Sequence, residues 1–146
     1  MPRDKRLNIP GGVYHVISRG IERRDIFLDG IDKTEFLSRL ENALVKTDSQ
    51  CLAWVLMGNH FHLLIRTGTK SLSELMRKLL TGYAIYFNKK HKRHGYLYQN
   101  RYKSVLCQED VYLLELVRYI HLNPVRAGII STIEELDVYP WSGIAS

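Results

Sequence analysis

The sequence predicts an α+β domain, because its apolar pattern switches between strand and helix periodicity along the chain. The predicted elements follow the order β–α–β–β–α–β–α, with a hairpin in the middle. This order is typical of a ferredoxin-like, split βαβ antiparallel sheet with helices packed on one face. The length of 146 residues and the hydrophobic content of 45% fit one such domain with a sizeable core.

The first two elements are a strand and an amphipathic helix. The strand covers residues 13–18, VYHVIS, which are rich in residues favoured in strands. His15 within it is most simply a structural residue, and metal ligation is the alternative. The helix covers about residues 32–46, where apolar residues recur at helical spacing.

A β-hairpin over residues 51–66 follows, and it is the centre of the predicted site. Its strands are joined by Gly58-Asn59, and His60 and His62 open the second strand. Because side chains alternate faces in a strand, the two imidazoles project to the same side, roughly 7 Å apart along the chain. The apolar residues between and after them face the core, so we expect both histidines on the exposed face of the sheet.

Two imidazoles on one face can hold a divalent ion, because each offers a neutral nitrogen lone pair. The alternative is that His60 and His62 merely flank the turn and satisfy ordinary hydrogen bonds. The spacing of the pair is compatible with both interpretations, so other parts of the chain must decide between them.

The second half of the chain begins with a capped helix. Ser71, with Glu74 three residues later, forms a capping-box signature, and the helix that it opens runs to about His91. Residues 96–106 are predicted to be a loop that enters a strand.

The C-terminal region predicts one more clear helix, a short helical turn and an irregular tail. Glu109 and Asp110 begin the helix, because acidic residues suit the positive end of the helix dipole. Pro124 ends it, and Asn123 is a candidate cap for a short helical turn that follows. The tail through residues 139–142 carries mixed signals and is predicted to be irregular.

The charge of the chain favours an acidic partner. The formal net charge is +6 and the pI is near 9.4, which makes a polyanion the leading class of partner. Between Met76 and Gln108 there is no Asp or Glu, and tyrosines are interleaved with the cations there. Cations that follow a phosphate backbone and aromatics that stack on bases are typical of a single-strand DNA site. The eight cations predicted to contact DNA are Arg77, Lys78, Lys89, Lys90, Lys92, Arg93, Arg101 and Lys103.

The alternative to a DNA-binding site is that these residues form a solvated basic helix end with tyrosines in the core.

The sequence also bears on the location of the protein in the cell. It has no apolar run long enough for a transmembrane helix, and the charged start MPRDKR lacks an apolar signal core. We therefore expect a cytoplasmic protein with no membrane partner. Cys51 and Cys107 do not suggest a disulfide framework.

Two motifs together resemble a known family. His60-Phe61-His62 follows a strand that ends in Met57-Gly58-Asn59, and residues 119–128 read YIHLNPVRAG. This combination resembles the single-tyrosine HUH transposases, and within them the IS200-like or REP-associated tyrosine transposases. The resemblance spans nearly the whole chain, including QNRYKS at residues 99–104, so residues 1–146 are interpreted as one HUH-type transposase/nuclease domain.

The resemblance implies a metal-dependent endonuclease and strand transferase that acts on single-stranded DNA through a 5′-phosphotyrosine intermediate. His60 and His62 match the ligands of Mg²⁺ or Mn²⁺, and Tyr119 matches the nucleophile. Asn123, four residues further along the helix, matches a third ligand, although its capping role competes and His121 is a local alternative. The expected partner is single-stranded or hairpin DNA, bound by a monomer or a homodimer.

Two other functions remain open at this point. One is a non-catalytic nucleic-acid-binding domain of the same fold, in which the histidine pair is structural. The other is a metal-dependent phosphoesterase in which water replaces the tyrosine as the nucleophile.

Overall fold

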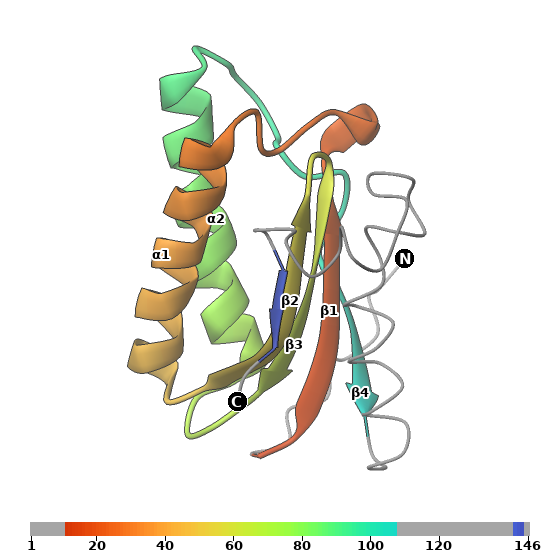
Figure 1. The fold of residues 1–146 in the computed structure, drawn as a ribbon, viewed down its shortest axis with the longest axis vertical. Helices are drawn as coiled ribbons and strands as arrows, with labels where there is room; N and C mark the ends of the chain where they lie inside the picture. Colours follow the sequence, from red (N-terminus) through yellow and green to blue (C-terminus); the bar gives the residue numbers. More distant parts are fainter. Residues whose placement is uncertain (1–10, 108–141, 145–146) are drawn as a thin grey trace.

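The sheet of this protein is antiparallel and has the strand order β4-β1-β3-β2-β5 (Figure 1). The computed structural model describes residues 11–107 and 142–144. The order β4-β1-β3-β2 with two intervening helices confirms the predicted ferredoxin-like α+β class. The elements are β1 (Val13–Arg19), the 3₁₀ turn η1 (Ile21–Arg23), α1 (Gly30–Thr47), β2 (Gln50–Met57), β3 (His60–Arg66), α2 (Leu72–Lys90), β4 (Lys103–Cys107) and β5 (Ser142–Ile144).

Both helices cover the same face of the sheet, as predicted (Figure 1). Each is capped by the expected kind of residue. The Asp29 carboxylate accepts a hydrogen bond from the Asp32 N–H at 2.8 Å, and the Ser71 hydroxyl accepts one from the Glu74 N–H at 3.1 Å. The capping of α2 confirms its predicted start, whereas α1 begins two residues before the predicted position. No helix in the described residues is long and apolar enough to cross a membrane.

An aromatic cluster fills the space between the helices and the sheet. Phe36 of α1 lies 4.9 Å from Phe61 of β3 and 5.3 Å from Tyr83 of α2, between ring centroids. All three side chains are fully buried. The alternation along β3 that places Phe61 in this core therefore places His60 and His62 on the opposite face.

The opposite face of the sheet is not open at its centre, which corrects one expectation. His62 is only 4% exposed, although it was expected on an exposed face. Strands buried on both faces carry nearly continuous apolar runs, and the sequences of β2 and β3 have that character. A second cluster of buried apolar side chains, separate from the aromatic core, consists of Val13, Ala53, Val55, Met57 and Leu64.

The tail prediction was also wrong in part. Ser142–Ile144 forms β5, which pairs antiparallel with β2 so that Ser142 faces Val55 and Ile144 faces Ala53. Three residues are too few to show a strand period, so pairing with the edge of β2 decides their conformation. The predicted helix from Glu109 and the turn after Asn123 lie outside the described residues.

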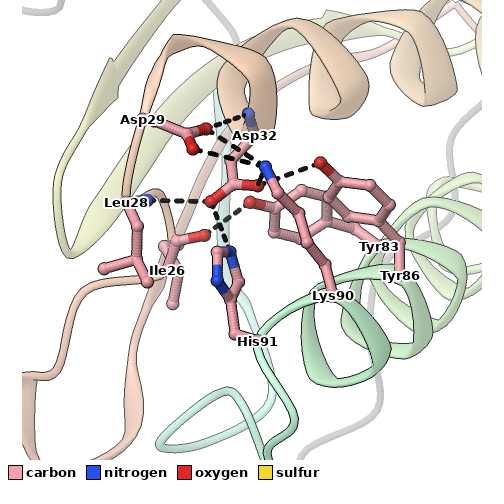
Figure 2. Close-up of polar contacts among 8 residues, drawn as sticks. All are labelled: Ile26, Leu28, Asp29, Asp32, Tyr83, Tyr86, Lys90 and His91. Atoms are coloured by element: carbon pink, nitrogen blue, oxygen red, sulfur yellow. Dashed lines mark hydrogen bonds and ion pairs between the residues drawn. The ribbon is translucent and has the colours of Figure 1, made fainter.

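A buried carboxylate joins the start of α1 to the end of α2 (Figure 2). Asp32 is fully buried and accepts hydrogen bonds from Lys90 Nζ at 2.8 Å and from the Tyr86 hydroxyl at 2.9 Å. It also accepts the Leu28 N–H at 3.0 Å and lies 2.9 Å from His91 Nε2. Burial opposes its ionisation, but these hydrogen bonds, that from Lys90 foremost, hold the pKa of Asp32 below its ordinary value.

Candidate functional site: a histidine pair beside a basic cavity

The predicted histidine pair lies at the tip of the β2–β3 hairpin, close to η1 (Figure 1). The ring centroids of His60 and His62 are 5.3 Å apart, and the ring planes are inclined at 78°. The pair therefore shares one face of β3, as the period-2 spacing predicts.

The hydrogen bonds of His60 determine which of its nitrogens carries the lone pair. Its Nδ1 lies 2.7 Å from Asn59 Oδ1. The amide of Asn59 is oriented by a second contact, because its Nδ2 donates to the Arg23 carbonyl at 3.3 Å. Since Asn59 Oδ1 can only accept, Nδ1 of His60 carries the proton and donates it. In the neutral ring, the lone pair then lies on Nε2 of His60.

His62 has a comparable partner in β1. Its Nδ1 lies 3.1 Å from His15 Nε2, and the two rings stack at 5.3 Å with planes 18° apart. Burial foremost, together with the charges that His15, His60 and Arg19 can carry, lowers the pKa of His62 to about 3. His62 is therefore neutral at pH 7. When its Nδ1–H donates to His15, its lone pair lies on Nε2 as well.

These two imidazoles fit a divalent ion. A metal-bound histidine is neutral and usually donates its second ring N–H to another protein group, as Asn59 and His15 allow here. His15 contacts His62 and does not add a third ligand. Among the described residues, no group of three or more His, Cys, Asp or Glu side chains could hold a metal. Tyr119 and Asn123 lie outside the described residues.

The structure places six of the eight predicted DNA-binding cations in three separate parts of the fold. Arg77 and Lys78 lie exposed in the first half of α2. Lys89 and Lys92 lie exposed at the end of α2. Arg101 and Lys103 lie beside β1, where they line a cavity.

The other two cations already have internal partners. Lys90 pairs with Asp29 at 3.3 Å and with Asp32, and the latter contact raises the pKa of Lys90. The guanidinium of Arg93 donates to Asn88 Oδ1 at 2.8 Å and to the Tyr96 carbonyl at 2.9 Å.

Most of the interleaved tyrosines belong to the fold, as the alternative interpretation expected. The hydroxyl of Tyr83 donates to the Ile26 carbonyl, and that of Tyr98 donates to the Leu80 carbonyl at 3.0 Å. Tyr86 bonds Asp32, and Tyr102 is buried. Tyr96, by contrast, is 83% exposed and has a face free for stacking.

The family model described as "Transposase IS200 like" matches residues 9–123, which is most of the chain. The chain belongs to the IS200-like transposases. No curated protein matches it.

Two solved structures resemble this IS200-like transposase. A REP-associated tyrosine transposase bound to a REP hairpin is 19% identical over 97% of this chain and 82% of the other, with a TM-score of 0.79. A candidate transposase from Deinococcus radiodurans R1 is 16% identical over 82% of this chain and 94% of the other, with a TM-score of 0.54. At these identities the likeness shows the fold.

The roles of several residues of the site were not predicted from the sequence of this IS200-like transposase. Asn59 was treated only as a turn residue, although a polar side chain next to His60 is a weak signal for a hydrogen bond. The contact of His15 with His62 depends on strand register, in which His15 faces Leu64. Neither that register nor the presence of Arg19 and Arg23 in the basic cavity can be derived from strand periodicity alone.

Proposed function

We propose that this IS200-like transposase is a metal-dependent endonuclease and strand transferase for single-stranded DNA, and that residues 1–146 form its single catalytic domain. The observation that carries the proposal is the histidine pair, whose rings share one face of β3 and whose Nδ1 atoms both have hydrogen-bond partners. Membership of the transposase family supplies the reaction class.

His60 and His62 would hold Mg²⁺ or Mn²⁺, and Asn123 is the candidate for a third ligand. When bound there, the ion polarises the scissile phosphate and neutralises the charge that develops on it. The neutrality of His62 suits this role, because a protonated imidazole repels the ion and has no lone pair for it.

Tyr119 would be the nucleophile. Its phenolic oxygen attacks a DNA phosphorus, the new O–P bond forms, and the bond from phosphorus to the 3′ oxygen breaks. The phenolic proton is lost and the departing 3′ oxygen gains one, which leaves a free 3′-OH and a 5′-phosphotyrosine. That 3′-OH, or one from another strand, can then attack the phosphotyrosine, which releases Tyr119 and joins the ends.

The proposed substrate is single-stranded DNA that contains a hairpin. A structurally similar transposase is bound to a REP hairpin. The exposed cations of this chain, Lys89 and Lys92 among them, provide charge for a phosphate backbone. Exposed Tyr96 provides a ring for base stacking.

The covalent intermediate gives the decisive test. The protein is incubated with Mg²⁺ and hairpin-containing oligonucleotides labelled at either end, and the products are separated on a denaturing gel. We expect a protein–DNA band only when the label lies 3′ of the cut, and we expect EDTA and Tyr119→Phe to abolish it. Cleavage that persists in Tyr119→Phe would identify water as the nucleophile.

A binding module without catalysis is the second candidate. It is favoured by the hydrogen bonds of His60 and His62, since a purely structural pair would also be satisfied in this way. It predicts binding of the same oligonucleotides with neither a metal requirement nor any cleavage.

A further inference from the structure

A small basic cavity lies next to the histidine pair, on the other side of β1. Its volume is about 270 Å³, near the lower limit of about 300 Å³ for small-ligand sites. It can therefore admit one nucleotide but not a duplex. Four of the residues that line it are cations, and two are amides: Arg19, Arg23, Arg101, Lys103, Gln99 and Asn100.

The backbone around the cavity is fixed by hydrogen bonds. The Gln99 N–H donates to the Arg19 carbonyl and the Ile21 N–H donates to the Leu97 carbonyl, both at 2.9 Å. These bonds hold the loop before β4 against the end of β1. The cavity is thus built from segments far apart in sequence and does not depend on one mobile loop.

Arg23 reaches the cavity through an unusual turn. Glu22 and Arg23 both have left-handed backbone conformations, with φ of 54° and 60°. Gly20 permits the tight fold, because a Cβ at this position would lie 2.0 Å from the Arg24 carbonyl oxygen. Non-glycine residues adopt left-handed φ rarely and at a cost, and such positions cluster at functional sites.

The electrostatics of the cavity select an anion. Among the described residues, no acidic side chain lines the cavity and none of its four cations forms an ion pair. Arginine donates in a planar fork that matches two phosphate oxygens. Gln99 and Asn100 add amide groups that can donate or accept at a sugar or base edge.

The strand register connects this cavity to the histidines. Arg19 faces His60, and Ile17 lies between His62 in β3 and Lys103 in β4. Two strand spacings place the backbone of Lys103 roughly 10 Å from that of His62. A second link is direct, since the Arg23 carbonyl accepts the bond that orients Asn59 against His60.

We propose that this cavity holds the nucleotide next to the scissile phosphate, with Arg19, Arg23, Arg101 and Lys103 on its phosphodiester. The proposal rests on the proposed function for the identity of the strand. A phosphate bound in the cavity would lie at a fixed distance from the scissile phosphate. The cavity would therefore help to determine which phosphodiester bond is cleaved.

The test measures binding without cleavage, and so stands apart from the catalytic proposal. The probe is a labelled oligothymidylate of about 12 nucleotides, within the site sizes of single-strand binding folds, titrated in EDTA over a range of salt. Arg101→Gln/Lys103→Gln should reduce the slope of log affinity against log salt by about 0.7, the change expected when one phosphate is no longer neutralised. Lys46→Gln/Lys70→Gln removes the same charge from exposed positions outside the cavity and is the matched control.

A neutral-phosphate scan locates the contact. Each phosphate of a cleavable hairpin oligonucleotide is replaced in turn by methylphosphonate. Methylphosphonate at a position near the cleavage site should weaken binding to the wild-type protein and to the control variant. The same replacement should not change binding to Arg101→Gln/Lys103→Gln. The same interference pattern in all three proteins, or equal salt slopes, would overturn the cavity proposal. If the cavity variant still forms the covalent adduct at the wild-type position, the catalytic proposal stands without the cavity.

Discussion

The smallest unit that carries chemistry in this protein is a hydrogen-bonded chain of single residues. It runs from the Arg23 carbonyl through the Asn59 amide to Nδ1 of His60. Each member fixes the orientation of the next, because an amide with its nitrogen committed can present only oxygen to the ring. In the proposed metal site Asn59 is therefore a positioning residue, because its side chain orients the ring of His60.

The prediction at this scale concerns Asn59→Ala. Loss of the Oδ1 acceptor should weaken Mn²⁺ binding by about 10- to 100-fold, in line with other partners that orient metal-binding histidines. Isothermal titration with Mn²⁺ measures the effect, and ¹⁵N spectra of the metal-free protein report whether His60 still carries its proton on Nδ1. Asn59→Asp keeps an acceptor and should retain most of the affinity. Equal Mn²⁺ affinity in wild type and Asn59→Ala would contradict the positioning role.

At the scale of elements, the Asp32 network fastens the start of α1 to the end of α2 (Figure 2). The sequence predicted both helices within two residues at each end, because capping and apolar spacing are local signals. It could not predict that Lys90 turns inward to Asp32. That contact spans 58 positions and depends on how the helices pack.

The prediction for this element is a pH-dependent loss of stability in Asp32→Asn. The folded pKa of Asp32 lies below its ordinary value of 3.8, so its ionisation stabilises the fold above that pH. At pH 7 the variant should lose about 1–3 kcal/mol of unfolding free energy, because Lys90 loses its charged partner. The difference should shrink as the pH falls below 3.8, since the wild-type carboxylate is then protonated.

Urea denaturation at several pH values measures this difference. Asp48→Asn is the matched control, because Asp48 is exposed and its left-handed conformation suits Asn equally well. A stability difference for Asp32→Asn that stays constant from pH 7 to pH 3 would show that its ionisation contributes nothing.

For the whole molecule, the sequence predicted the order of the described strands and helices except β5. It also predicted the shared face of His60 and His62. It missed the burial of His62, the role of Asn59 and the cavity beside β1. These depend on strand register and on contacts between distant segments, which no local pattern contains. The eight cations between residues 76 and 108 were interpreted as one DNA-binding surface, whereas the fold gives Lys90 and Arg93 internal partners.

This division predicts different effects for neighbouring lysines. Lys89→Gln/Lys92→Gln should flatten the salt dependence of single-strand binding by about 0.7 for each phosphate that these lysines neutralise, and should leave thermal stability unchanged. Lys90→Gln should lower the melting temperature instead, because it removes the partner of buried Asp32. Fluorescence anisotropy and thermal melts on the three proteins separate the roles. An unchanged melting temperature in Lys90→Gln would show that Lys90 has no structural role and would again make it a candidate for DNA contact.

The two outermost strands have a consequence for the proposed nucleophile. β4 and β5 occupy opposite edges of the sheet, and four strand spacings separate them by roughly 19 Å. Tyr119 falls between them in the sequence, so the polypeptide that carries it is anchored at both ends to the sheet that carries His60 and His62. The pairing of β5 with β2 therefore closes a loop of the chain between the two edges of the sheet that carries the proposed metal site.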